Sequence, residues 1–172
     1  MACIFNNEEV GSGSYMGADS NFLYTTLLRV FDDLGIRERD MYDILENSWA
    51  VSSDNAQGYH PNYPEKYDAQ HRCILNQGVA VKISANQKYT TDSVTAARFR
   101  EICRKAGAPC QWYENHPAIP GGSTLGNLLI SQLSIHSVDI GLPQVAMHSA
   151  TETMGSRDVM NLVKIFRCFY NE

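Results

Sequence analysis

Four side chains of this sequence are of the types that hold a metal ion or move a proton. Glu8 and Glu9 are adjacent and follow a short apolar run, while Asp54 and His148 each follow another apolar run. Glu, Asp and neutral His are ordinary zinc ligands, and one carboxylate of a pair can bind the metal while the other accepts a proton from water. The pattern therefore predicts a metal site, against the alternative of solvated acids and a structural histidine.

Two glycine-rich segments could bind an anionic group through backbone N–H groups. In the first, Gly11, Gly13 and Gly17 miss the dinucleotide fingerprint because the third glycine comes one residue late, so we expect no dinucleotide cofactor. The second, residues 120–126, reads PGGSTLG before a helical pattern. Its N–H groups could receive an oxyanion, or the segment could be only a tight turn. No G-x-S-x-G sequence is present, which argues against a serine hydrolase.

The strands and helices that position these side chains can be predicted from the apolar patterns of the sequence. Short apolar runs predict strands over residues 2–5, 49–51, 79–83, 111–113, 137–140 and 145–147. Helical spacing predicts one helix between a cap at Asp19 or Ser20 and Gly35, and others over residues 37–47, 91–107, 124–133 and 157–170. This alternation is typical of an α/β fold, a layered mixed or parallel sheet flanked by helices. Ligands bind such sheets at the carboxyl ends of the strands, where the four candidate residues fall.

The composition is that of a folded, mildly acidic protein. The 172 residues are 44% hydrophobic and 19% charged, with a net charge of −5. One domain is expected, and binding to nucleic acid or anionic membranes through charge is not. No apolar run approaches the ~18 residues of a membrane-spanning helix. The first residues lack the pattern of a signal peptide, and five cysteines without metal-type spacing indicate reduced thiols. We therefore expect a cytoplasmic protein.

Five segments, in order along the chain, resemble motifs of one family, the aspartyl aminopeptidases, which are dizinc metallopeptidases. Residues 6–12 read NNEEVGS, where the family has D-N-E-E-V-G-S, and residues 143–149 read PQVAMHS, close to P-Q-x-x-M-H-S. Residues 53–66 resemble a segment with D-x-A-H-A-x-H-P-N-Y, residues 85–92 resemble N-A-N-Q-R-Y-x-x-D, and residues 119–124 read IPGGST as the family does. The resemblance spans the whole chain and implies the fold of that family's catalytic domain.

The resemblance implies a role for each matching residue. Glu8 would be the general base, and Glu9, Asp54 and His148 would be zinc ligands. Two zinc ions would acidify a water whose proton Glu8 accepts. Lys82 would meet the acidic side chain of the substrate, unless it is only an exposed lysine of an edge strand. The implied activity releases N-terminal acidic residues from peptides, in a homo-oligomer. Further substrate contacts are expected from His60, Gly121, Gly122 and Ser123.

The chain also departs from the family. Family members are longer, and the part that would precede Met1 carries a His-x-Asp ligand motif, an Asp that bridges both metals and a dimerisation domain. We therefore expect residues 1–172 to be the C-terminal portion of the catalytic domain, with poorly occupied zinc sites and no activity by itself. Gln57 and Ala118 replace a family His and a family Asp. The alternative is a non-catalytic, degenerate piece that assembles with itself, through residues 54–77 or an open edge at residues 2–5.

Overall fold

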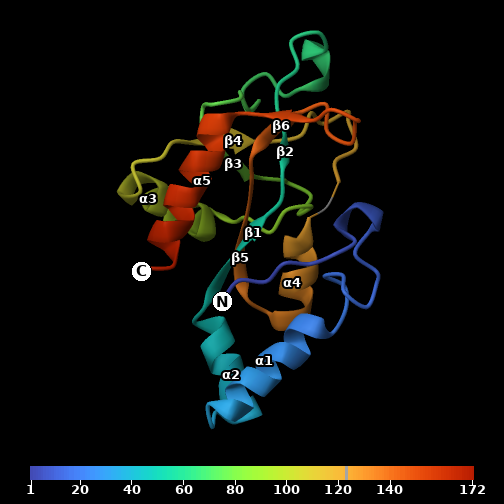
Figure 1. The fold of residues 1–172 in the computed structure, drawn as a ribbon. Coiled ribbons are helices and arrows are strands. Elements are labelled where there is room, and N and C mark those ends of the chain that lie inside the picture. Colours follow the sequence, from blue (N-terminus) through green and yellow to red (C-terminus); the bar gives the residue numbers. More distant parts are fainter. Residues whose placement is uncertain (123) are drawn as a thin grey trace.

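The computed structural model describes residues 1–122 and 124–172, and its main layer is a four-stranded sheet (Figure 1). The strands are β1 (Trp49–Ser53), β3 (Val79–Lys82), β4 (Cys110–Tyr113) and β5 (His136–Gly141). Their order in the sheet is β1–β5–β3–β4. β1 is parallel to β5 and β3 is parallel to β4, whereas β3 and β5 are antiparallel. The sheet is therefore mixed, which confirms the predicted fold class.

Helices cover both faces of this sheet. α3 (Ser93–Lys105) and α5 (Ser156–Phe169) pack on one face, and α4 (Leu125–Leu133) lies on the other side of β1 and β5 (Figure 1). Because side chains alternate along a strand, Val79 and Val81 face α3 and α5, while Ala80 and Lys82 face the other way. The core between the sheet and these two helices contains Val79, Val81, Phe99, Ile102, Val138, Ile140 and Ile165.

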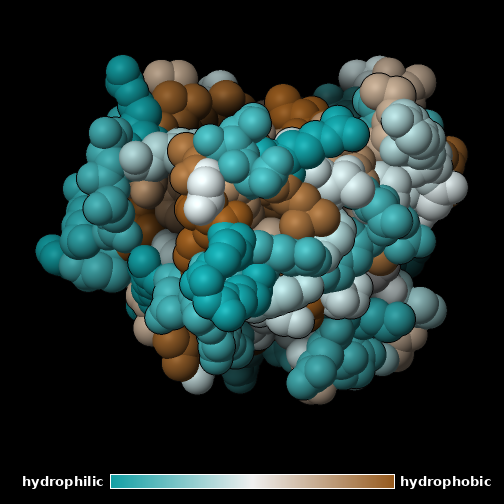
Figure 2. Space-filling model, turned by 90° about the horizontal axis from the view of Figure 1, so that it is seen from below, coloured by the Kyte–Doolittle hydropathy of each residue, from teal (hydrophilic) through white to brown (hydrophobic). Residues whose placement is uncertain are grey.

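A helical hairpin forms one end of the molecule. It consists of α1 (Phe22–Asp33) and α2 (Glu38–Glu46), which pack together and against the end of α4. Buried apolar side chains join the three helices: Leu23, Met41, Leu45 and Leu133. Figure 2 looks onto this end and shows hydrophobic regions between hydrophilic ones. The exposed apolar side chains of the hairpin are Phe22, Val30, Leu34, Tyr42 and Ile44.

A second, smaller sheet continues from the first. It contains β2 (Ala56–Gln57), β6 (Pro143–Val145) and β7 (Thr153–Met154). β2 is parallel to β6, and β6 is antiparallel to β7. Asp54 lies between β1 and β2, where its N–H still donates to the carbonyl of Ile140 at 3.1 Å. A Cβ on Gly141 would lie 2.0 Å from the carbonyl oxygen of Asp54, so only glycine permits this close passage.

The predicted elements are largely present. All five predicted helices form, with small shifts at their ends. The strand predicted over residues 2–5 is wrong, because this segment is largely exposed and pairs with no strand of the described chain. The strand predicted over residues 145–147 lies earlier, at Pro143–Val145, since Ala146 takes a positive φ of 58° that ends it. Within the described residues, no helix has the length and apolar character needed to cross a bilayer.

Candidate metal and active site

A cleft of about 360 Å³ lies at the carboxyl ends of β1, β3 and β4. This is where an α/β sheet binds ligands. Gly121 and Gly122 line the cleft as well, while Ser123 lies outside the described residues. The cleft brings together all the residues predicted to be catalytic or metal-binding, and the lysine predicted to bind substrate: Glu8, Glu9, Asp54, Lys82 and His148.

Glu8 and Glu9 reach the cleft from a single turn of 3₁₀ helix, Glu8–Val10. Left-handed residues enclose this turn, Asn7 with φ 61° and Gly11 with φ 94°, and the N–H of Gly11 donates to the carbonyl of Glu8 at 2.9 Å. Burial raises the pKa of Glu8, and the nearby carboxylates of Asp54 and Glu9 raise it further, while Lys82 and His148 oppose the shift. Glu8 therefore binds a proton more readily than an ordinary carboxylate.

Glu9 and His148 form the closest pair among the predicted ligands. Oε2 of Glu9 lies 2.7 Å from Nε2 of His148, although the two side chains are 69% and 65% exposed. The backbone of His148 is left-handed, with φ 67°, and its N–H donates to the carboxylate of Glu152 at 2.6 Å. The turn after β6 thus presents the imidazole to the turn that carries Glu9.

Asp54 belongs to a different pair. Its Oδ2 lies 3.5 Å from Nζ of Lys82, whose side chain is only 3% exposed. Burial lowers the pKa of Lys82, and the charges of Asp54 and Asp139 oppose this shift. The ammonium also lies 5.5 Å from the centre of the Tyr89 ring. The alternative that Lys82 is an exposed lysine of an edge strand is wrong, because Lys82 belongs to the interior strand β3 and is buried.

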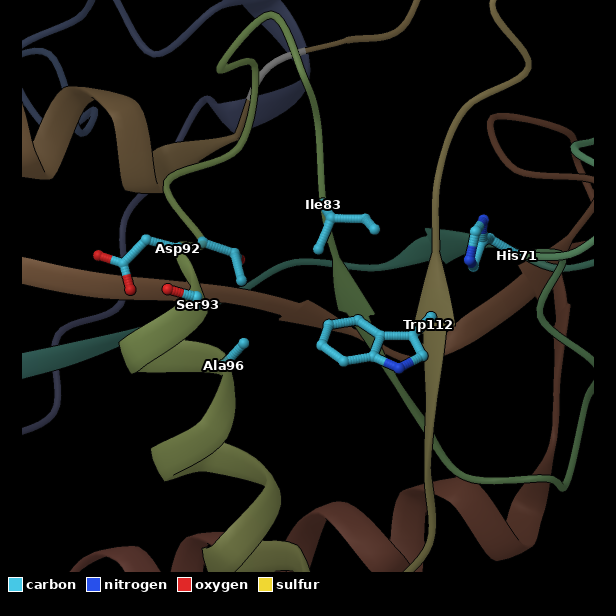
Figure 3. Close-up of a pocket in the computed structure, with 7 residues that line it drawn as sticks. His71, Ile83, Asp92, Ser93, Ala96 and Trp112 are labelled. Atoms are coloured by element: carbon cyan, nitrogen blue, oxygen red, sulfur yellow. The ribbon is translucent and has the colours of Figure 1, made fainter.

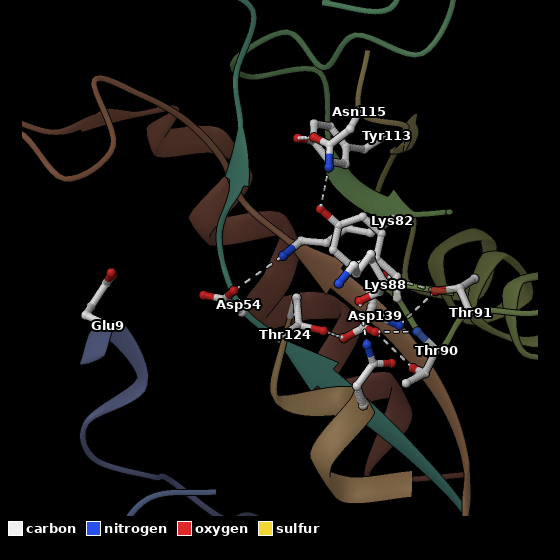
Figure 4. A network of polar contacts seen from close by, with 12 residues as sticks. Glu9, Asp54, Lys82, Lys88, Thr90, Thr91, Tyr113, Asn115, Thr124 and Asp139 are labelled. Atoms are coloured by element: carbon white, nitrogen blue, oxygen red, sulfur yellow. Dashed lines mark hydrogen bonds and ion pairs between the residues drawn. The ribbon is translucent and has the colours of Figure 1, made fainter. Parts of the chain in front are cut away.

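Asp139 is a charged residue of the site region that the sequence analysis missed. It is fully buried in β5, and its carboxylate accepts hydrogen bonds from the N–H and hydroxyl of Thr90, at 2.7 and 3.0 Å, and from the hydroxyl of Thr124 at 2.7 Å. Figure 4 shows this network beside the Asp54–Lys82 pair, with Glu9 separated from it. A carboxylate between Val138 and Ile140 in a predicted strand was the available signal, since buried charges need partners.

Two tyrosines and an amide complete the floor of the cleft. The hydroxyl of Tyr113 donates to the side-chain oxygen of Asn115, whose amide donates to the hydroxyl of Tyr89 at 3.2 Å. Gly121 rests against the same amide, because a Cβ there would lie 2.0 Å from its nitrogen. The glycine therefore lets the 120–122 segment approach Asn115 closely.

His60, predicted to contact substrate, does not line this cleft. Its ring lies 5.3 Å from the Tyr63 ring, in the irregular loop after β2. A second hollow, of about 270 Å³, lies between β4 and the start of α3 (Figure 3). Trp112, Ile83 and Ala96 line it, and none of the predicted site residues does.

The donor set fits zinc in chemical type and only partly in geometry. Two carboxylates and an imidazole are suitable ligands, and Glu9 and His148 are close enough to share one ion. Asp54 is instead held by Lys82. Across residues 1–122 and 124–172, no three His, Cys, Asp or Glu side chains come close enough together to hold a metal ion.

Carboxylates and a histidine line a cleft at the strand ends of an α/β sheet, an arrangement that suits a metal-dependent hydrolase. Residues 1–170 match the family model described as "Aminopeptidase I zinc metalloprotease (M18)", and the chain belongs to this family. It is 44% identical to the probable M18 family aminopeptidase 2 of Clostridium acetobutylicum over 171 residues, covering 99% of this chain and 39% of the relative. The corresponding protein of Pseudomonas aeruginosa (strain UCBPP-PA14) is 43% identical over 166 residues, 96% of this chain and 38% of the relative.

Solved structures agree with this assignment. The crystal structure of prApe1 matches with a TM-score of 0.92 and 31% identity, over 98% of this chain and 35% of that one. The S. cerevisiae mApe1 dodecamer matches with a TM-score of 0.84 and 30% identity, over 98% of this chain and 37% of that one. The chain thus spans about two fifths of the length of the curated relatives, and its fold is that of the matching part of M18 aminopeptidases.

Proposed function

We propose that residues 1–172 are the C-terminal portion of the catalytic domain of a zinc aminopeptidase that releases N-terminal acidic residues from peptides. Membership of the M18 family supports the reaction class. The observation that carries the proposal is one cleft that is lined by a proton acceptor, three zinc-type donors and a lysine. The other half of the active site lies, in this proposal, in the part of the relatives that this chain does not span.

The geometry supports a division of the donors between two metal ions. Glu9 and His148 are 2.7 Å apart and would bind the same ion. Asp54, on the far side of the cleft, would bind the second. Zinc, when bound, would supply the Lewis acidity that lowers the pKa of water. Neither ion would have a complete set of protein ligands from these residues alone, because catalytic zinc sites usually have three.

Glu8 is the residue best suited to accept a proton in this cleft. Within residues 1–122 and 124–172, its carboxylate forms no ion pair like the one that joins Glu9 to His148. Burial raises its pKa, and a general base works best when its pKa approaches the working pH. Glu8 would take a proton from the attacking water and return it to the leaving amine.

The substrate would lie along the cleft with its first residue near Lys82. Backbone groups of Gly121 and Gly122 would border the peptide, with Ser123 beside them and His60 contacting a more distant part. Lys82 lies in a buried position where an ammonium interacts strongly with a carboxylate. It would therefore favour an acidic side chain, and in the absence of substrate it would be paired with Asp54.

A homo-oligomer in the cytoplasm is part of the same proposal. The mApe1 relative forms a dodecamer, and the hairpin of α1 and α2 exposes apolar side chains that a partner surface could cover. The alternative function is non-catalytic self-assembly, which the same exposed apolar side chains of the hairpin would serve.

Metal analysis and peptide hydrolysis test these alternatives. The purified chain should hold little zinc and should not cleave aspartyl or glutamyl peptides. A chimera in which this chain replaces the matching segment of the Clostridium acetobutylicum relative should hold zinc and cleave both. In the chimera, Glu8→Gln should keep zinc and lower kcat by about 10²–10⁴-fold, whereas Glu9→Gln should lose zinc as well. The exposed Glu46→Gln is the matched control.

The outcomes separate the hypotheses. A chimera that folds and binds zinc but cleaves nothing would favour non-catalytic assembly. Two tightly held metals in the isolated chain, with turnover that Glu8→Gln removes, would show that the site is complete without further ligands. Equal loss of zinc in Glu8→Gln and Glu9→Gln would contradict the separate roles of the two carboxylates.

Lys82→Met in the same chimera tests the preference for acidic residues. Losing a charge-assisted contact worth about 1.5–3 kcal/mol should reduce cleavage of aspartyl and glutamyl peptides by roughly 10–150-fold. Alanyl and leucyl peptides should change little, and the exposed Lys164→Met is the control. A uniform fall for all peptides would mean that Lys82 only holds Asp54.

A further inference from the structure

The loop between β6 and β7 holds His148 in an unfavourable backbone conformation. The two strands are antiparallel, with Val145 opposite Thr153, and they close a loop of residues 146–152. Ala146 and His148 in this loop are left-handed, with φ 58° and 67°. Left-handed backbone is uncommon for residues other than glycine and persists only where the surrounding structure imposes it. Contacts around His148 must therefore maintain this conformation.

A tight turn places His148 at a position where glycine would be usual. The N–H of Ser149 donates to the carbonyl of Ala146 at 3.0 Å, so His148 is the third of four turn residues. A positive φ at the third position of such a turn favours glycine or asparagine. Histidine supplies an imidazole there, and its Nε2 lies 2.7 Å from Oε2 of Glu9. The direction of this imidazole therefore depends on a conformation that histidine does not favour by itself.

Glu152 makes a direct contact with the backbone of His148. Its Oε1 accepts a hydrogen bond from the N–H of His148 at 2.6 Å. An ionised acceptor makes such a bond shorter and stronger than a neutral acceptor does. Glu152 directly precedes Thr153, whose pairing with Val145 ties this end of the loop to β6. The carboxylate thus connects the strained turn to the paired strands, and Glu152 and His148 line the same cleft.

The peptide groups on both sides of His148 are held by hydrogen bonds. Glu152 holds the group before it through the N–H of His148, and Ala146 holds the group after it through the N–H of Ser149. Because peptide groups are planar, the two dihedral angles of His148 relate these planes and set the direction of its side chain. Release of the first plane would let the backbone leave the left-handed region and turn the imidazole away from Glu9.

We propose that Glu152 is a positioning residue that acts through the backbone of His148. It keeps the imidazole directed at Glu9 and at the metal ion that the two side chains would share. Glu152 is not itself a ligand in this role, which agrees with the lack of any three-residue metal cluster within residues 1–122 and 124–172. The consequence for metal binding rests on the proposed function, whereas the effect of Glu152 on the conformation of His148 does not.

Hydrogen exchange measured by NMR on the purified chain, labelled with ¹⁵N-histidine, tests this effect. The chain has five histidines, and the loss of one signal in His148→Gln identifies the amide of His148. In Glu152→Ala this amide should exchange roughly tenfold faster or more, because a hydrogen bond to a charged acceptor is lost. Glu152→Gln should keep most of the protection, since a carboxamide oxygen also accepts.

Thr151→Ala is the matched control, because it changes an exposed side chain in the same loop. It should leave the exchange of the His148 amide unchanged. Glu152 is also exposed, so its variants are expected to fold. Equal exchange rates at His148 in the wild-type chain and Glu152→Ala would overturn the proposal.

Zinc affinity, measured by competition with a chelator in the chimera described above, tests the consequence for the metal. Glu152→Ala should weaken zinc binding by about 10–100-fold, Glu152→Gln by about threefold or less, and Thr151→Ala should have no effect. Equal losses in the two Glu152 variants would mean that Glu152 acts through its charge, as a ligand does, and would overturn the positioning role. A wild-type chimera without zinc would instead contradict the proposed function, and the exchange rates would still decide whether Glu152 holds His148.

Discussion

The two sides of the cleft are built in different ways. On one side, Lys82 and Asp139 are buried at strand positions, and Asp139 accepts three hydrogen bonds. On the other side, Glu9 and His148 lie on turns, are more than half exposed and are joined by one polar contact. The hydrogen bonds between the strands and the apolar core behind the sheet hold the residues of the first side in place. The second side depends on left-handed turns and would gain rigidity from a bound ion that replaces the direct contact.

The fold preorganises the first side of the cleft and leaves the second side less constrained. Burial makes the groups on the first side costly to leave without partners. Their geometry is therefore coupled to the stability of the whole chain. Exposed ion pairs contribute little, so residues of the second side can be chosen for chemistry with small consequences for stability. Urea unfolding of this chain measures how strongly each side of the cleft is coupled to stability.

The largest effect is expected for Asp139→Ala. The substitution leaves Thr90 and Thr124 without their buried acceptor and removes one of the charges that balance Lys82. We expect the free energy of unfolding to fall by about 3 kcal/mol or more. The exposed Asp32→Ala should change it by less than about 0.5 kcal/mol. Similar losses of unfolding free energy in the two variants would mean that the hydrogen bonds of Asp139 do not hold the first side of the cleft in place.

A smaller change in the free energy of unfolding is expected at the start of α3. This helix begins just after Thr90, one of the residues that donate to Asp139. Asp92 caps this helix and accepts a hydrogen bond from the N–H of Thr95 at 2.7 Å. Burial opposes ionisation, but the hydrogen bonds from Thr95 outweigh it and lower the pKa of Asp92. Asp92→Ala should therefore cost about 1 kcal/mol at neutral pH.

The pH dependence of this cost follows from the direction of the shift. A depressed pKa in the folded state stabilises the protein above the unfolded pKa, near 3.9, and the contribution is lost as the pH falls through the folded value. The difference between wild type and Asp92→Ala should thus be constant from about pH 5 to 7 and shrink below about pH 4. A difference that grows on acidification would contradict the capping role.

The smallest effects are expected for the exposed pair. Glu9→Gln and His148→Gln should each change the free energy of unfolding by less than about 0.5 kcal/mol, because the contact lies in solvent. Their combination should be additive within the same margin. A loss of more than 1 kcal/mol in either variant would show that the two sides of the cleft are equally tied to the fold.

The regular elements were predictable where the local pattern is long or strongly apolar. Helices such as α3 and α5 carry many turns of helical spacing, so their ends shifted only slightly. Residues 2–5 have an equally apolar pattern, but they pair with no strand in the part of the chain that the structure describes. The two-residue strands β2 and β7 form because each pairs with β6. A local sequence pattern cannot predict this pairing.

Sequence patterns alone predicted the chemical types at the site, the position of Asp54 at the end of a strand, and the family. The burial of Lys82 against Asp54, the contact between Glu9 and His148 and the hydrogen bonds of Asp139 beside the cleft follow from the three-dimensional fold. Local patterns specify helix or strand because they depend on neighbours three or four positions apart. Burial and pairing depend on segments that are far apart in the chain: Asp54 and Lys82, like Thr90 and Asp139, meet only because the strand order β1–β5–β3–β4 brings them to one place.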